Sequence, residues 1–270
     1  MLEPPFITFN GVERQLRERI IGYGLPSSGK TNAWLDIARL HQASGSDATF
    51  YVCDSEDGVY DSMKRDYTDL ANVDVCVVGE FPDWTEWAER VAGVVKHGDW
   101  VVADSGSTAY ERATEYYLFK RFGKSKATLQ LEAALDPTSR GPAIEPGDWT
   151  NIRTMFLYWW NSQIINDCSM KGGAHVFATA EAKPVLEHFE RKKNDKTITQ
   201  EYGEIGHRPD ANPKWLHRIN TILYFQRAGK AGGYSYYVRP AKDRQRDESH
   251  FKLENGFAVD YLINRAGWTM

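Results

Sequence analysis

The feature that most constrains the fold of this chain is a glycine-rich octapeptide that matches the pattern G-x-x-x-x-G-K-[ST] in full: Gly24, Leu25, Pro26, Ser27, Ser28, Gly29, Lys30 and Thr31. In this pattern the glycines allow successive backbone N–H groups to turn inward around a polyphosphate. Lys30 would neutralise the β and γ oxygens, and the Thr31 hydroxyl would bind Mg²⁺. The octapeptide, together with Asn32 at the start of the next helix, therefore predicts a nucleotide-binding loop.

The segments around this loop predict an α/β fold. Apolar, β-rich runs alternate with polar or helical segments at 20–23, 49–53, 73–78, 100–103 and 175–179. Apolar strands joined by helical crossovers are typical of a parallel sheet that is covered on both faces. Residues 219–225 and 234–238 flank a glycine-rich turn. We therefore expect a mainly parallel central sheet with helices on both faces and a C-terminal antiparallel hairpin.

A length of 270 residues fits one α/β domain with insertions. Asn10-Gly11 is a hairpin signal, so residues 1–19 are predicted to form an N-terminal ribbon. The core is predicted at 20–246, with an insertion near 105–147, where the periodic pattern weakens and Pro, Gly and Ser accumulate. Residues 247–270 would form a C-terminal extension.

Composition excludes several classes of protein. With 41% hydrophobic and 26% charged residues, the chain is not a largely disordered one. Its three cysteines lack the CxxC spacing of a zinc site and suit buried, reduced thiols. No apolar run approaches the roughly 18 residues of a membrane span, and the N-terminus does not resemble a signal peptide. We expect a cytoplasmic protein, in the host cell if it is viral, that does not contact a membrane.

Two strand ends supply carboxylates for the metal and for catalysis. The apolar run 100–103 ends in Asp104, which is predicted to bind Mg²⁺ directly or through water. The residue after Asp104 is a serine, so the catalytic base must come from elsewhere. The run 49–53 ends in Asp54, Ser55 and Glu56 and should reach the same sheet edge, which makes Glu56 the candidate base. The alternative is that Asp54 and Glu56 cap the helix that follows.

Taken together, the P-loop, the Asp-Ser-Glu sequence and Asp104 resemble the RecA-like core ATPases, and in particular the short RecA-like ATPases encoded by phages and associated with recombination and single-strand annealing. The resemblance covers roughly 20–246 and implies a RecA-like P-loop NTPase core with ATP and Mg²⁺ as cofactors. It implies that Glu56 activates water. It also implies that a polar residue at the end of the 175–179 strand, Thr179 or Glu181, senses the γ-phosphate.

Near the C-terminus, Lys242 and Arg244 resemble the Lys-x-Arg finger of DnaB-like and KaiC-like proteins, which reaches the γ-phosphate bound by a neighbouring subunit. This resemblance implies a homo-oligomer, either a hexameric ring or a filament. Cations at that position would offset the charge that develops during phosphoryl transfer. The alternative is an exposed basic strand end.

The same resemblance places DNA-binding loops after the Asp104 strand and after the 175–179 strand. The net charge is −4, but 183–246 hold fourteen Lys and Arg against seven Asp and Glu. Cations and aromatic side chains suited to phosphates and unstacked bases occur in both loops. They are Lys120, Arg121, Lys124, Lys126, Arg191, Lys192, Lys193 and Lys196, with Tyr116, Tyr117, Phe119 and Phe122. We expect single-stranded DNA as the partner; the alternative is that these aromatic residues form a helix face that packs on the core.

Two further readings of the sequence remain open. One is a motor or packaging ATPase that acts on a protein partner. The other is a P-loop kinase or a nucleotide-dependent switch, in which the Arg-rich segment 191–208 would serve as a lid. ATP is favoured over GTP because the chain lacks an N/TKxD base-reading motif.

Overall fold

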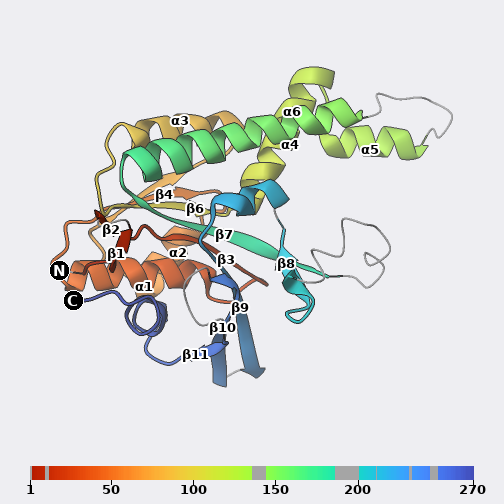
Figure 1. The fold of residues 1–270 in the computed structure, drawn as a ribbon. Helices are drawn as coiled ribbons and strands as arrows, with labels where there is room; N and C mark the ends of the chain where they lie inside the picture. Colours follow the sequence, from red (N-terminus) through yellow and green to blue (C-terminus); the bar gives the residue numbers. More distant parts are fainter. Residues whose placement is uncertain are drawn as a thin grey trace.

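The computed structural model describes residues 2–9, 12–135, 144–185, 201–210, 212–230, 233–243 and 249–270. Figure 1 shows how the elements are arranged. In chain order they are β1 (Phe6–Phe9), β2 (Val12–Gln15), β3 (Arg19–Gly24), α1 (Lys30–Ala43), β4 (Phe50–Asp54), α2 (Gly58–Asp66), β5 (Val73–Val77), α3 (Phe81–Ala92), β6 (Trp100–Asp104), α4 (Gly106–Phe122), α5 (Lys126–Leu135), α6 (Pro146–Leu157), η1 (Tyr158–Lys171), β7 (His175–Pro184), β8 (His207–Pro209), η3 (Pro213–Arg218), β9 (Thr221–Lys230), β10 (Gly233–Asp243), β11 (Phe251–Leu253) and η4 (Ala258–Ile263).

A nine-stranded sheet forms the centre of the protein. Its strand order is β11-β10-β9-β3-β7-β6-β4-β5, and β8 pairs with β7 outside this path. The strands β9, β3, β7, β6, β4 and β5 run parallel to one another, whereas β10 and β11 add an antiparallel edge and β8 pairs antiparallel with β7. The predicted C-terminal hairpin is formed by β9 and β10 and is longer than the sequence indicated.

The central strands β3, β4 and β6 are buried on both faces of the sheet, which explains why they are mostly apolar. Successive residues point to opposite faces, so Ile20 packs in one hydrophobic cluster and Ile21 in the other. Helices α3, α4 and α6 with η1 cover the Ile21 face, and α1, α2 and η4 cover the Ile20 face (Figure 1). The predicted class, an α/β fold with a mainly parallel central sheet, helices on both faces and a C-terminal antiparallel hairpin, is confirmed.

The strand order brings four strand ends to one edge. β3 lies between β7 and β9, and β6 lies between β7 and β4. The carboxyl ends of parallel strands share one edge of a sheet, which is where ligands bind in open α/β folds. The chain therefore delivers the ends of β3, β4, β6 and β7 to the same place.

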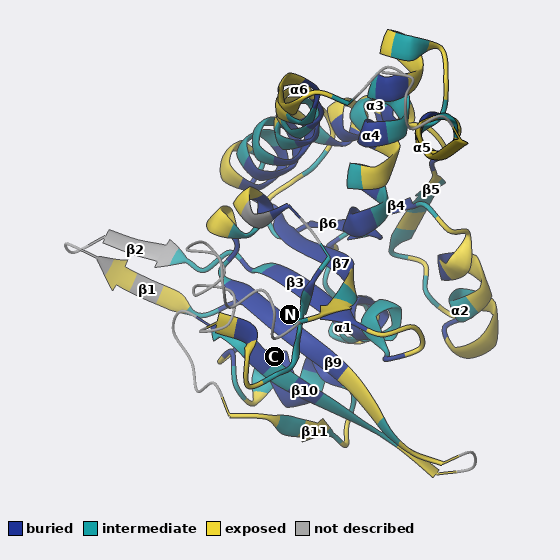
Figure 2. Ribbon diagram, turned by 90° about the vertical axis from the view of Figure 1, so that its right-hand side faces the viewer, coloured by how far each residue is buried: buried dark blue, intermediate teal, exposed yellow. Residues whose placement is uncertain are grey.

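The segments outside the predicted core also contribute to the structure. β1 and β2 form a separate antiparallel ribbon, and β1 points away from the main sheet (Figure 2). At the other end of the chain, β11 joins the main sheet, and Tyr261 and Trp268 are buried. Asp36 of α1 accepts the Phe257 N–H at 3.0 Å, which ties this extension to the helix after the P-loop.

Most of the described part of the predicted insertion near 105–147 is helical. α4 begins at Ser105, whose hydroxyl accepts the Thr108 N–H, and ends at Gly123 in the left-handed conformation. α5 follows, with Leu131 and Leu135 exposed. Residues 136–143, which hold much of its Pro, Ser and Gly content, lie outside the described residues. In the part of the chain that is described, no helix combines the length and the hydropathy needed to span a bilayer.

Candidate active site

The octapeptide connects the end of β3 to the start of α1, as its glycines require. A Cβ atom built on Gly24 would lie 2.4 Å from Ser28 Oγ and 2.5 Å from the Phe225 carbonyl oxygen, so only glycine fits there. Gly29 has φ 96°, which L side chains rarely adopt, and Ser27 has φ 59°. The loop thus folds back tightly at the amino end of α1, whose N–H groups and dipole favour an anion.

Lys30 spans the loop. Its Nζ donates to the carbonyl oxygens of Gly24 at 3.0 Å and Leu25 at 3.2 Å. Burial lowers the pKa of Lys30, while the negative charges of Asp104, Glu181 and Glu56 raise it. Three carboxylates from three different strand ends therefore act on one ammonium group.

Asp104, at the end of β6, accepts hydrogen bonds from both neighbouring elements. The Thr31 hydroxyl donates to Oδ2 at 2.9 Å, and the Trp34 indole N–H donates to the same oxygen at 3.0 Å. From β7, the Thr179 hydroxyl donates to Oδ1 at 2.5 Å. The two residues predicted to bind the metal, Thr31 and Asp104, are thus in direct contact.

Asp54 and Glu56 occupy different environments. Asp54 is buried, and its carboxylate accepts the N–H groups of Glu56 at 3.1 Å and Val59 at 3.0 Å. Burial raises the pKa of Asp54, against the effect of these hydrogen bonds. Glu56 is exposed, and Thr108 of α4 donates to its Oε1 at 3.3 Å. Asp54 thus accepts an N–H group in the first turn of α2, whose N-cap residue is Asp57, whereas the exposed Glu56 side chain is available to a ligand.

β7 continues to Pro184, so the two candidate sensors lie within this strand and not at its end, and they too are separated. Thr179 is fully buried against Asp104, whereas Glu181 is exposed and pairs with Gly24 across the β3–β7 ladder. The Ser107 hydroxyl accepts the Glu181 N–H at 3.0 Å, which fixes the backbone there. Glu181 lies level with Gly24 of the glycine-rich loop, and the Thr179 hydroxyl contacts the Asp104 carboxylate.

Lys242 lies away from the P-loop of its own chain. β10 is antiparallel to β9, so Lys242 pairs with Ile222, which is level with Ile21 near the start of β3. Its Nζ donates to the Leu216 carbonyl oxygen at 3.2 Å. Arg244, the other half of the predicted finger, lies outside the described residues.

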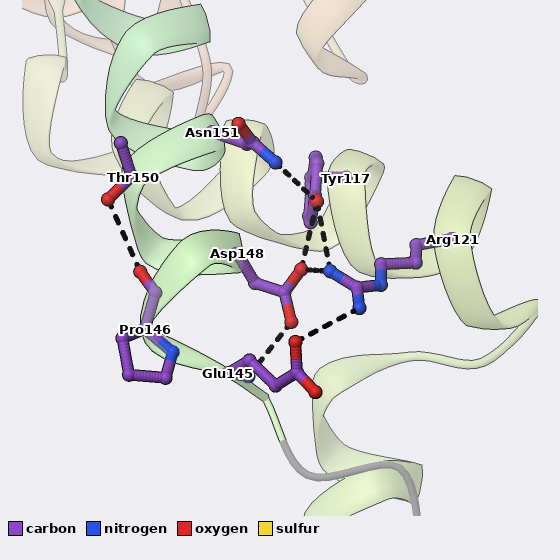
Figure 3. Close-up of polar contacts among 7 residues, drawn as sticks. All are labelled: Tyr117, Arg121, Glu145, Pro146, Asp148, Thr150 and Asn151. Carbon is purple, nitrogen blue, oxygen red and sulfur yellow. Dashed lines mark hydrogen bonds and ion pairs between the residues drawn. The ribbon is translucent and has the colours of Figure 1, made fainter.

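Two of the residues considered for DNA binding link helix α4 to α6. Figure 3 shows Tyr117 and Arg121 of α4 directed toward Asp148, which is fully buried at the start of α6. The Tyr117 hydroxyl donates to Asp148 Oδ1 at 2.9 Å, and Arg121 forms an ion pair with the same carboxylate. Lys124 pairs with Glu132 at 2.7 Å. The second basic segment, with Arg191, Lys192, Lys193 and Lys196, lies outside the described residues.

Sequence reasoning missed three residues at this site. Trp34 lies three residues after Thr31, which places both side chains on one helix face beside Asp104. Thr108, which contacts Glu56, carries no sequence signal because α4 approaches β4 only in the folded chain. Tyr236 of β10 lies against the P-loop, with Cδ1 3.4 Å from a Cβ built on Gly29.

No protein-family model matches this chain, and no curated protein matches its sequence. Among solved structures, a KaiC-like protein from the hyperthermophilic archaeon Pyrococcus horikoshii OT3 is similar, with 12% sequence identity and a TM-score of 0.44. The match covers 88% of this chain and 85% of that chain. At this level of similarity, the roles of individual residues rest on the geometry of this chain alone.

Proposed function

We propose that this chain is a Mg²⁺-dependent ATP hydrolase of the RecA-like class. The observation that carries the proposal is the contact between Thr31 and Asp104, made directly beside the Lys30 loop. Phosphoryl transfer needs a phosphate cradle, a metal-binding hydroxyl and carboxylate, and a group that activates or positions water. Lys30, Thr31, Asp104 and Glu56 meet these needs at one sheet edge.

The residues fit a magnesium nucleotide. Mg²⁺ prefers oxygen ligands and is usually held by one or two carboxylates together with substrate phosphates and water. In the described ranges no group of three or more His, Cys, Asp and Glu forms a metal cage, so substrate oxygens would complete the coordination around Thr31 and Asp104. The Ser28 hydroxyl, buried within the loop, has no hydrogen-bond partner among the described residues and suits a phosphate oxygen.

Each residue has a distinct role in the proposed reaction. Bound Mg²⁺ would offset charge on the phosphate oxygens, and Lys30 would do the same from the other side of the loop. Glu56 would accept a proton from the attacking water, with Thr108 orienting its carboxylate. Thr179 would position Asp104, and Glu181 would lie beside the γ-phosphate.

Lys242 and Arg244 would act on a neighbouring subunit, so the active form would be a homo-oligomer. The register of β10 supports this assignment because it holds Lys242 away from its own P-loop. A cation in trans would complete the charge stabilisation only at an assembled interface.

We assign single-stranded DNA as the coupled partner, in phage recombination or replication in the host cytoplasm. The support is the resemblance of the motifs and the local positive charge of 183–246. Because Tyr117, Arg121 and Lys124 are engaged within the fold, the assignment relies mainly on the segment that follows β7.

The test is release of free phosphate from ATP and Mg²⁺, with and without single-stranded DNA, at several salt concentrations. Lys30→Ala should abolish nucleotide binding and turnover. DNA should stimulate the wild type, and the stimulation should fall as salt rises because phosphate contacts release counterions. Hydrolysis without DNA stimulation would support a protein-coupled motor instead. A phosphorylated acceptor without free phosphate would identify a kinase and overturn the proposal.

A further inference from the structure

The β9–β10 hairpin extends past the phosphate loop. β3 ends at Gly24, opposite Phe225 of β9, and β9 continues to Lys230. Figure 2 shows this pair of strands running out beyond the rest of the sheet. The part of the hairpin beyond Phe225 therefore places side chains next to the glycine-rich loop.

Tyr236 is the hairpin residue that meets the loop. Its ring lies against Gly29, at the turn into α1, with Cδ1 3.4 Å and Cε1 3.7 Å from a Cβ built there. The side chain is half-buried. Val238, two residues further on, is fully buried in the hydrophobic core, whereas Tyr236 belongs to neither of the two core clusters among the described residues. Core packing thus does not account for an aromatic residue at this position.

A cation lies on the same face of the hairpin. Arg227 pairs directly with Tyr236 across the β9–β10 ladder, and directly paired residues project to one face. The guanidinium carbon of Arg227 lies 4.5 Å from the centroid of the Tyr234 ring, also on this face. The contact orders the guanidinium over the Tyr234 ring, on the face of the hairpin that carries Tyr236.

The chemistry of this surface matches a nucleobase. Bases stack on aromatic rings and on guanidinium planes with little dependence on sequence, because each base has a π-face. A polyphosphate in the loop would leave its nucleoside outside the loop. We propose that Tyr236 and Arg227 form the platform on which the base of the bound nucleotide lies. This inference rests on the proposed nucleotide binding and adds the residues that recognise the base.

The test compares two ligands that share the phosphate chain, ATP and inorganic tripolyphosphate, each with Mg²⁺, by calorimetric titration. Tyr236→Ala should weaken ATP binding about tenfold and leave tripolyphosphate binding unchanged, since only ATP carries a base. Tyr236→Phe should bind ATP with the wild-type affinity, and Arg227→Ala should bind ATP several-fold more weakly. Tyr237→Ala is the matched control, because Tyr237 is a half-buried neighbour on the opposite face of the strand.

An equal loss of both ligands in Tyr236→Ala, or no loss of ATP, would overturn the platform. The first result would mean that Tyr236 supports the conformation of the loop. The second would mean that the base does not lie on Tyr236. Failure of the proposed function is distinguishable, because the wild type would then bind neither ligand and Lys30→Ala would change nothing.

Discussion

Asp54 and Glu56 are two residues apart, and one holds the other in place: the buried Asp54 carboxylate accepts the Glu56 backbone N–H at 3.1 Å. That hydrogen bond, with a second from Val59, keeps the Asp54 side chain inside the protein. The Glu56 side chain is left at the surface, toward Thr108. The two carboxylates look equivalent in the sequence, but substituting them is expected to have different effects.

Glu56→Gln should lower hydrolysis by about 10²–10⁴-fold, the range that a general base contributes, and leave ATP affinity unchanged. The amide preserves the size of the side chain and an oxygen for the Thr108 hydrogen bond but cannot take a proton from water. Single-turnover phosphate release and equilibrium nucleotide binding measure the two effects separately. Near-normal turnover would remove Glu56 from the reaction.

Asp54→Ala should act on stability. It removes a buried acceptor of two backbone N–H groups at the start of α2, which we expect to cost about 1–3 kcal/mol of the free energy of unfolding. Urea denaturation followed by circular dichroism measures this change. Glu56→Gln, whose side chain is exposed, is the matched control and should stay within about 0.5 kcal/mol of the wild type. The opposite pattern would exchange the roles of the two residues.

The turn from β3 into α1, the parallel sheet and the position of Asp104 at a strand end could be predicted from the sequence because their signals are local. Gly24 and Gly29 belong to one octapeptide pattern that is visible in the sequence, and Asp104 ends an apolar strand. The ends of parallel strands then converge through topology alone. Thus Lys30, Thr31, Asp104 and Glu56 could be grouped without coordinates.

The remaining contacts depend on register between distant segments, which a single sequence does not encode visibly. Tyr236 reaches Gly29 only because β9 continues past β3 and β10 returns along it. Likewise, the antiparallel direction of β10 carries Lys242 away from the loop. Arg121 has the local character of a DNA-binding residue, yet the fold places buried Asp148 beside it.

Thr31 gives a prediction about the metal. Thr31→Ala removes the hydroxyl that contacts Asp104 and should raise the Mg²⁺ concentration for half-maximal hydrolysis by roughly tenfold or more. Thr31→Ser keeps the hydroxyl and should behave like the wild type. The measurement is ATP hydrolysis as a function of Mg²⁺ at fixed nucleotide. Equal Mg²⁺ dependence in Thr31→Ala and Thr31→Ser would show that the hydroxyl does not serve the metal.

His41 makes stability depend on pH. It is buried, accepts the Trp100 indole N–H at 3.1 Å, and burial lowers its pKa to about 4. In the unfolded chain, His41 takes up a proton near pH 6.5. Its contribution to the free energy of unfolding is therefore complete above that pH and falls as the pH is lowered toward 4. His175, whose pKa burial also lowers, acts in the same direction.

Between pH 7.5 and pH 5, His41 alone should cost about 2 kcal/mol of the free energy of unfolding. His41→Gln keeps an acceptor for Trp100 and should lose correspondingly less stability over this interval. His250→Gln, at an exposed position, is the control and should follow the wild type. Urea titrations at the two pH values measure the difference. Parallel losses in the wild type and His41→Gln would exclude a buried neutral His41.

The position of Lys242 predicts complementation between inactive chains. Lys242→Ala should lower hydrolysis about a hundredfold or more, as the loss of a finger in trans does. Mixed with Glu56→Gln, it should regain activity: a Lys242→Ala chain supplies an intact Glu56, and its Glu56→Gln neighbour supplies the lysine. In a head-to-tail assembly of equal parts, about one interface in four combines them, so about a quarter of the wild-type rate is expected. A chain carrying both substitutions should rescue neither variant. If the mixture stayed as inactive as its components, Lys242 would not act across an interface, and its contact with the Leu216 carbonyl would be its role.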